Sequence, residues 1–419
     1  MSVPIATVQP IAPEQRLVQL DVLRGLALLG VLLVNIGNFS GADWALEAGM
    51  DFPMGAYGDS ASTWVRILLE NKAAAALSLL FGAGMAIQAE RAASAGRSGK
   101  WFALRRAAVL ALFGALHTLL LWNLDILLDY ALISLLVLPF LNLSAGRVLW
   151  AILPVLVLTA LLSLPLLASA VDLTAAQFYA LGLQHYGQGS WLDALQFRIW
   201  ETVHTIGPTR IANRLAILSP FFIIGVSAWK AGWLMSPDQH RTALKRVFAV
   251  CFSLGLLANA VPQESLHAWV NTTLSWQPLR ILIKATFFFG QFTLTLGYGA
   301  GILLALRYRP ARAVLSVLAP LGRMALTQYL LQSLICTWLF HGFGLGLYGR
   351  LPFDQVLLLG LLIFVAQIIG SHLWLARFRI GPAEWLWRYL SYGRRGDHAH
   401  GLSQSPSDCR AKHKAQMEH

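Results

Sequence analysis

The chain has 419 residues, of which 57% are hydrophobic and 12% are charged, and its formal net charge is +12. Soluble globular proteins carry about 25% charged residues, so the composition excludes an ordinary soluble domain and predicts a membrane protein. Its three cysteines and eleven histidines have neither the spacing of metal ligands nor that of a disulfide framework. We therefore expect no metal.

Apolar segments follow one another along residues 21–376, each about long enough to cross a bilayer, which takes roughly 17–25 residues. The predicted fold class is all-α, a polytopic membrane helix bundle of about ten transmembrane helices. Two segments form a hairpin with its turn near residues 123 and 124. The others lie at about 21–39, 64–89, 148–171, 215–233, 247–261, 279–306, 323–340 and 356–376.

The stretches outside these segments are polar or amphipathic. Residues 1–20 predict a cytoplasmic tail, residues 377–393 an amphipathic interfacial helix, and residues 394–419 a disordered basic tail. Within the bundle, residues 40–62 and 172–212 predict polar connections, and residues 313–322 predict a short interfacial helix.

The positive charges indicate an orientation, because Lys and Arg gather in the cytoplasmic loops of membrane proteins. With both termini cytoplasmic, about three-quarters of the 32 Lys and Arg residues fall on the cytoplasmic side. This predicts a multi-pass protein of the bacterial inner (cytoplasmic) membrane. Orientation and contact with anionic lipids account for the basic charge, so we expect membrane lipids as partners and no nucleic acid.

The hairpin carries the ionisable residues that are hardest to explain. Residues 114–130 read GALHTLLLWNLDILLDY, and an aspartate at the centre of a membrane helix costs about 2.5–3.5 kcal/mol on insertion scales. His117 and Asp129 fall at similar depth on the two arms, which favours a His–Asp contact. Alternatively, His117 bonds a backbone carbonyl, and Asp125 and Asp129 cap the second arm from the aqueous side.

Further polar residues fall at other depths. Asp21, Arg24, Arg323 and Gln328 lie near the predicted cytoplasmic ends of their helices, whereas Lys72 lies toward the outer side. Together they predict a polar path across the bilayer. The alternative for Asp21 and Arg24 is a local ion pair, because residues three apart on a helix are neighbours.

Several stretches, spread over nearly the whole chain, resemble the YeiB-like family of bacterial integral membrane proteins. They are Leu20-Asp21, Arg24-Gly25, Asn35, Lys72, residues 80–84, Gly114, His117, Trp122, residues 125–127, Tyr130-Ala131, residues 322–327, Tyr329, Gln332-Ser333 and residues 381–388. The resemblance extends to the transmembrane acyltransferase superfamily, which includes heparan-α-glucosaminide N-acetyltransferases. There, cytoplasmic acyl-CoA donates its acyl group through the membrane to an acceptor on the far side.

The chain departs from that superfamily pattern at two positions. The sugar-modifying members place a histidine eleven residues after the arginine of the first helix, whereas this chain has Asn35 after Arg24. Asparagine takes up no proton at neutral pH, so acyl transfer needs another base, and His117 is the candidate. Leu124 stands where the pattern has a glycine before the hairpin aspartate.

The function expected from this resemblance is transfer of an acyl group from cytoplasmic acyl-CoA to a sugar or lipid-linked acceptor. His117 is the expected catalytic base, since histidine titrates near neutral pH, and Asp125 or Asp129 orients it. The expected substrate-binding residues are Asp21, Arg24, Asn35, Lys72, Arg323, Gln328, Glu384 and Arg388. A transporter or channel using the same polar path is the main alternative. Another alternative is a regulatory or scaffold protein in which residues 384–388 form a docking helix. The sequence also allows a homodimer.

Overall fold

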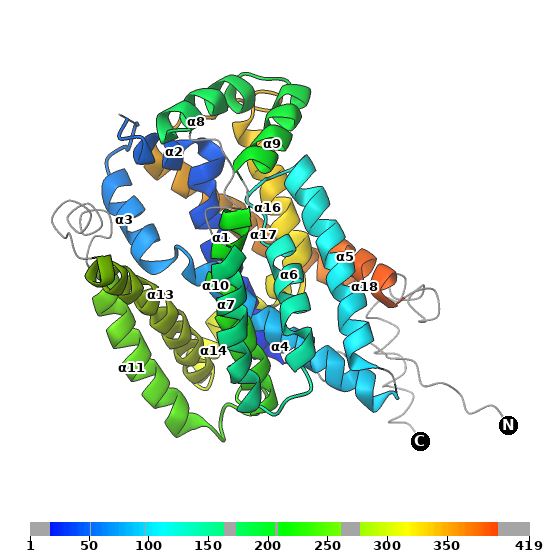
Figure 1. Cartoon of the computed structure of the whole chain (residues 1–419). Coiled ribbons are helices and arrows are strands. Elements are labelled where there is room, and N and C mark those ends of the chain that lie inside the picture. The colour runs from blue at the N-terminus through cyan, green and yellow to red at the C-terminus, as the bar shows by residue number, and fades with distance from the viewer. Residues whose placement is uncertain are drawn as a thin grey trace.

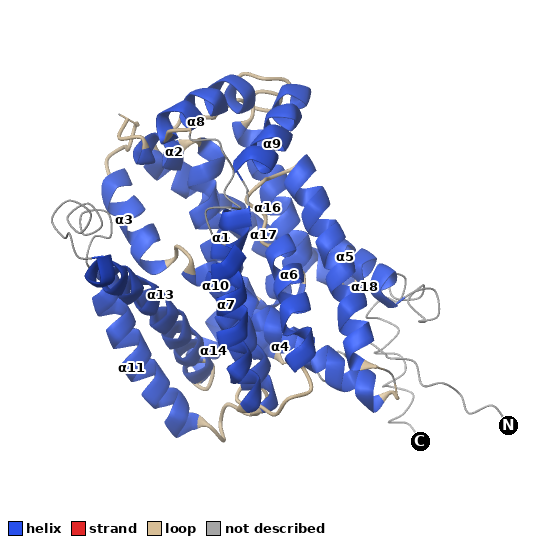
Figure 2. Cartoon of the chain, in the orientation of Figure 1, coloured by secondary structure: helices blue, strands red, loops and turns tan. Residues whose placement is uncertain are grey.

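The computed structural model of the chain describes residues 17–50, 52–96, 98–162, 173–205, 208–260 and 277–392. Every regular element in these ranges is a helix (Figure 2), which confirms the all-α fold class. The predicted disordered tail at 394–419 and nearly all of the predicted tail at 1–20 lie outside the described residues.

Among the described residues, six stretches are long and apolar enough to cross a membrane. They are α1 (Val18–Ser40), the pair α3 (Gly58–Leu68) and α4 (Lys72–Ser94), α5 (Gly99–Leu120), α10 (Pro208–Lys230), α11 (Arg241–Ala260) and α17 (Phe353–Arg377). Shorter apolar helices include α6 (Leu127–Val137), α7 (Ile152–Leu162) and α16 (Ala325–Phe340), and α13 (Gln277–Ala305) bends by 114° into α14 (Arg309–Ser316). Ten membrane crossings therefore stay a prediction.

The second apolar segment is broken, which corrects the single helix predicted for residues 64–89. The break falls between α3 and α4, where Asn71 has a left-handed backbone with φ of 61°. Asparagine enters this conformation more readily than most residues. The carbonyls freed by the break find partners, since Leu68 O accepts from the Tyr298 hydroxyl at 3.1 Å and Arg66 O from the Lys72 ammonium at 3.1 Å.

Two connections predicted as polar loops are helical instead. Residues 40–62 contain α2 (Ala42–Glu47) and the start of α3, and residues 172–212 contain α8 (Ala175–Gly182), a π-helix (Leu183–Gly187) and α9 (Trp191–Thr205). Helices α2, α8 and α9 lie together over one end of the bundle, at the top of Figure 1. We call this the far end, and the opposite end, where α1 and α5 begin and α4 ends, the basic end.

Helix α16 contacts α17 through amide and hydroxyl groups. The Gln328 amide donates to Ser371 Oγ at 2.8 Å, and the Gln332 amide donates to Gln367 Oε1 at 3.0 Å. Hydrogen bonds of this kind hold membrane helices together where hydrophobic contact alone gives little preference. Gln328, predicted to bind substrate, is thus engaged in helix packing.

Two short helices lie at the start of α16: α15 (Ala319–Arg323) directly precedes it, and α18 (Pro382–Tyr392) packs against it. Helix α18 is the amphipathic segment predicted for residues 377–393, and its Glu384 packs against the start of α16.

The break before α4 gives a prediction about Asn71. Replacing Asn71 with valine forces a β-branched residue into the left-handed region and should destabilise the protein by about 1–2 kcal/mol. Replacing it with glycine, the matched control, should leave stability nearly unchanged because glycine adopts this backbone freely. Thermal unfolding in detergent measures both, and a Val variant as stable as the Gly variant would contradict the described break.

Candidate functional site

A buried histidine, His117 on α5, stands between a carboxylate and a hydroxyl. Its Nδ1 lies 2.8 Å from Asp125 Oδ1, in the turn after α5, and its Nε2 lies 2.8 Å from Ser333 Oγ on α16. Their exposed fractions are 2% for His117, 3% for Asp125 and 3% for Ser333. The Asp125 oxygen is at ion-pair distance but out of line with the Nδ1–H bond.

Asp125 uses both of its oxygens. Oδ2 accepts from the Leu128 backbone N–H at 2.7 Å and so caps the start of α6, while Oδ1 faces His117 and accepts from the Tyr329 hydroxyl at 3.3 Å. Capping and the histidine contact, which the sequence presents as alternatives, occur together. The hairpin closes this tightly because residue 114 is glycine: a Cβ there would lie 2.5 Å from Leu128 N.

Asp129 does not contact His117, the partner that its predicted depth in the membrane favours. Its carboxylate lies 2.6 Å from the Arg214 guanidinium of α10, and the same guanidinium also donates to the Asp125 backbone carbonyl. The second arm of the hairpin starts as a helix only at Leu127. Asp125 therefore stays in the turn and faces α5, whereas Asp129 is on the first turn of α6 and faces α10.

The sequence prediction missed Ser333, Tyr329 and Arg214. A signal for the first two was present, because α16 carries polar residues every fourth position, at Tyr329, Ser333 and Thr337, continued by His341 just after the helix. Residues four apart lie on one face of a helix. Thr337 Oγ1 donates to Ser333 O at 2.5 Å, and the His341 backbone N–H donates to Thr337 O at 3.0 Å, whereas the nitrogens of the His341 ring have no hydrogen-bond partner among the described residues.

The stripe ends at a second buried polar cluster, beneath α9 at the far end. The His341 ring stacks on Tyr186 with centroids 4.7 Å apart, and the Tyr186 hydroxyl donates to Glu201 Oε2 at 2.8 Å. Arg198, 1% exposed, donates to the Leu119 carbonyl at the end of α5. Burial, aided by the positive charge of Arg198, lowers the pKa of His341 to about 3, so this histidine is neutral at physiological pH.

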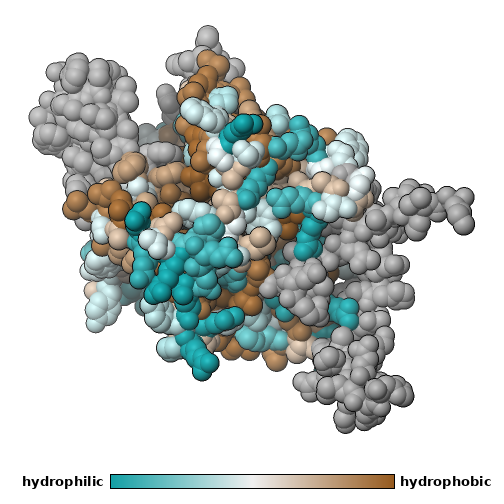
Figure 3. All heavy atoms as spheres, turned by 90° about the horizontal axis from the view of Figure 1, so that it is seen from below, coloured by the Kyte–Doolittle hydropathy of each residue, from teal (hydrophilic) through white to brown (hydrophobic). Residues whose placement is uncertain are grey.

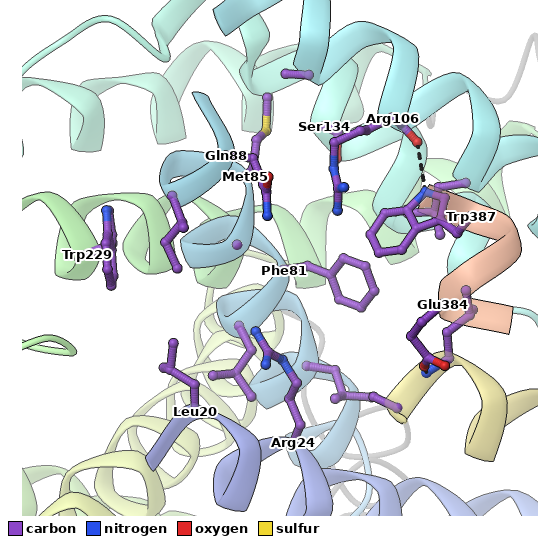
Figure 4. Close-up of a pocket in the computed structure, with 18 of the residues that line it drawn as sticks. Leu20, Arg24, Phe81, Met85, Gln88, Arg106, Ser134, Trp229, Glu384 and Trp387 are labelled. Atoms are coloured by element: carbon purple, nitrogen blue, oxygen red, sulfur yellow. Dashed lines mark hydrogen bonds between the residues drawn. The ribbon is translucent and has the colours of Figure 1, made fainter. Parts of the chain in front are cut away.

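A cavity of about 450 Å³ opens among α1, α4, α5 and α18 at the basic end. Figure 4 shows Arg24 reaching into it from α1, with Glu384 and Trp387 bordering it from α18. Its charged lining residues are Asp21, Arg24, Glu90, Arg91, Arg106, Arg323, Glu384 and Arg388. The structure thus gathers in one place five of the residues predicted to bind substrate.

This arginine cavity carries more positive than negative side chains. Asp21 and Arg24 form the local ion pair at 2.9 Å, while Arg106 lies over the Trp387 ring at 4.0 Å. Seen from below, hydrophilic side chains are spread over the described part of this face, with hydrophobic ones between them (Figure 3). Arginine forks bind phosphate oxygens two at a time, so the cavity can take an anionic, phosphate-bearing group.

The arginine cavity stops short of the histidine. Its deepest lining residue on α5 is Leu110, and on α6 it is Ser134, whereas His117 lies about two turns further along α5, roughly 10 Å. The rings of Phe81 and Tyr130 pack at a centroid distance of 4.7 Å. Phe81 lines the cavity, and the fully buried Tyr130 lies beyond it on α6. The arginine cavity therefore does not reach His117, which is buried in packed side chains and lines neither cavity.

The remaining predicted site residues lie elsewhere. Lys72, 2% exposed, lines a second cavity of about 480 Å³, which is almost wholly apolar and lies between α1, α4 and the α11–α13 pair. Asn35 is half-buried on α1 and lines neither cavity. Glu384 caps α16: Oε1 accepts from the N–H groups of Leu326 at 2.7 Å and Thr327 at 3.1 Å. Across the described part of the chain, no group of three or more His, Cys, Asp or Glu residues could hold a metal ion.

The chain is similar to bacterial proteins whose names state no activity. A family profile described as "Protein of unknown function (DUF418)" matches residues 228–394. The "Uncharacterized protein YxaH" of Bacillus subtilis (strain 168) is 31% identical, over 93% of this chain and 97% of its own. The "Uncharacterized protein YeiB" of Escherichia coli (strain K12) is 30% identical, over 90% and 96%. No solved structure matches with significance.

The capping role of Glu384 gives a second prediction. Glu384→Ala leaves two buried N–H groups and the Thr327 hydroxyl without their acceptor, which should cost about 1–3 kcal/mol of stability. Glu384→Gln keeps one acceptor oxygen and should cost less. Thermal unfolding of the purified variants, with exposed Glu47→Ala as control, measures the difference. An Ala variant as stable as the control would show that α18 does not anchor α16.

Proposed function

Because the chain belongs to the YeiB-like family of bacterial proteins and has the apolar helices of a membrane protein, we propose that it is a membrane acyltransferase, which moves an acyl group from acyl-CoA to an acceptor at or across the membrane. The observation that carries the proposal is the buried His117, held between Asp125 and Ser333, next to a chamber lined by arginines. A base beside a phosphate-binding surface is the pairing that acyl-CoA chemistry requires.

The arginine cavity receives the donor. Acyl-CoA carries its negative charges on the phosphates of its nucleotide end, and Arg24, Arg323 and Arg388 offer guanidinium groups to them. The long pantetheine arm places the thioester beyond the cavity, past the layer formed by Phe81 and Tyr130. Lys and Arg gather at this end, so on the positive-inside rule it faces the cytoplasm, where acyl-CoA is found.

His117 acts as the general base. Attack on a thioester requires a hydroxyl or amine to lose its proton as the new bond forms. Asp125 beside Nδ1 stabilises the imidazolium that results, and Nε2, which faces Ser333, is the nitrogen placed to accept the proton. Burial strengthens this electrostatic effect, because charges interact more strongly where water is excluded.

Transport is the second candidate, and one observation favours it. The break at Asn71 lies opposite the middle of α1, since a Cβ on Gly30 would meet Ala73 at 2.7 Å. Helices interrupted within the membrane form the solute and ion sites of many transporters. In that function the buried Lys72, beside the break, lies on the path of the solute.

The central test is release of CoA by the purified protein in lipid nanodiscs. With acyl-CoA donors from acetyl to palmitoyl and a membrane extract as the source of acceptor, we expect free CoA thiol to appear in proportion to protein. His117→Ala should lower the rate about 10²–10⁴-fold, the usual contribution of a general base. His372→Ala, an exposed histidine of α17, is the matched control. Solute uptake by proteoliposomes without acyl-CoA, together with no CoA release, would replace acyl transfer by transport.

The donor site gives a separate prediction. Arg323→Ala and Arg388→Ala should each raise the KM for acyl-CoA about tenfold, as expected for loss of one charged hydrogen bond worth about 1.5 kcal/mol, with kcat little changed. Exposed Arg350→Ala, at the far end, controls for loss of positive charge alone. Equal KM values in all three variants would place the donor elsewhere.

A further inference from the structure

His117, the proposed base, already has a hydroxyl group next to Nε2, the nitrogen that would accept the proton. Ser333 Oγ lies 2.8 Å from His117 Nε2, and Nδ1 is turned toward Asp125. An acceptor molecule therefore cannot give its proton to Nε2 unless it displaces Ser333. The proton that this imidazole is placed to take is that of Ser333 itself.

The arrangement of Ser333, His117 and Asp125 is that of an activated nucleophile. A hydroxyl bonded to one imidazole nitrogen, with a carboxylate at the other nitrogen, recurs on unrelated folds wherever serine attacks a carbonyl carbon. A plain structural role for Ser333 would be served as well by a bond to its own helix. Its contact with the Tyr329 carbonyl, however, is 3.5 Å long, at the outer limit for a hydrogen bond, so the imidazole is its main partner.

The turn after His117 adds an independent sign of a ligand. Trp122 and Asn123 are 3% and 4% exposed, and the indole Nε1 and the amide Nδ2 have no partner among the described residues. The Trp122 backbone N–H donates to His117 O at 2.8 Å, and its ring stacks on Phe39 of α1 with centroids 3.9 Å apart. Buried donors are almost always satisfied, and an acyl carbonyl oxygen in this turn would satisfy them.

We infer that Ser333 is an acyl carrier: the acyl group passes from acyl-CoA to Ser333 Oγ and from there to the acceptor. This rests on the proposed function. In the first step Ser333 Oγ attacks the thioester carbon, His117 Nε2 takes the hydroxyl proton, the C–S bond breaks, and that proton goes to the sulfur to give free CoA. In the second step the acceptor hydroxyl or amine attacks the serine ester, His117 takes its proton, the C–O bond breaks, and Ser333 Oγ regains a proton.

The position of Ser333 on α16 suits a relay. The polar stripe leads from Ser333 through Thr337 to His341 at the far end, while the arginine cavity lies on the basic side of the same helix, at Ala325 and Leu326. On the proposed function the donor arrives from the basic end. Carrying the acyl group on Ser333 lets the two substrates react in turn.

The test is to trap the acylated protein. Purified full-length protein in nanodiscs is mixed with radiolabelled acyl-CoA without acceptor, denatured in acid, and examined for protein-bound label and for the modified peptide by mass spectrometry. We expect label on Ser333 of the parent protein, and about 10²–10⁴-fold slower labelling in His117→Ala. Ser333→Ala should carry no label, and Ser60→Ala, a change of an exposed serine, should label normally.

A second variant keeps the inference testable if Ser333→Ala fails to fold. Ser333→Cys preserves size and nucleophilic character, and its acyl adduct should be a thioester that neutral hydroxylamine removes, whereas the serine ester resists it. Label on another residue, or acceptor-dependent release of CoA by a folded Ser333→Ala protein, would overturn the serine relay and leave acyl transfer standing. Absence of CoA release under every condition would instead overturn the proposed function and the relay together.

Discussion

The carboxylate of Asp125 is the contact on which the interior of this bundle depends. One oxygen caps the start of α6 through the Leu128 N–H, and the other faces the imidazole of His117 and the hydroxyl of Tyr329. A carboxylate is stable away from water only when it is paired and hydrogen-bonded. By satisfying that requirement with groups from three helices, Asp125 fixes the hairpin turn and holds α5, α6 and α16 in register.

Helix α16 transmits this constraint through the bundle. On one side Gln328 and Gln332 bond to α17 through amide groups, and on another side Ser333 meets His117. Apolar contact alone would leave the rotation of such a helix poorly defined in a lipid environment. The amide bonds to α17 remove that freedom, and they thereby aim the hydroxyl at the imidazole. Gln328, expected to bind substrate, contributes by holding the helix that carries Ser333.

Much of the bundle follows from the sequence, because hydropathy alone marks the apolar helices. A contact between His117 and a hairpin aspartate also follows, but which aspartate depends on where α6 begins, and hydropathy does not resolve that point. Ser333 is 216 positions from its partner His117, so only the fold brings them together. A search for long apolar runs misses α8 because it has only eight residues, and it misses α9 because polar residues interrupt it. The break at Asn71 lies inside an apolar run.

The burial of the histidine site bears on what chemistry it can support. Acyl transfer competes with hydrolysis, because water attacks the same carbonyl carbon as the acceptor, and a closed site suppresses that side reaction. The arginine cavity ends before His117, which lines neither cavity and is 2% exposed. On the proposed function, the thioester has to pass Phe81 and its neighbours before it reaches His117, and the same packing keeps water from the acyl group.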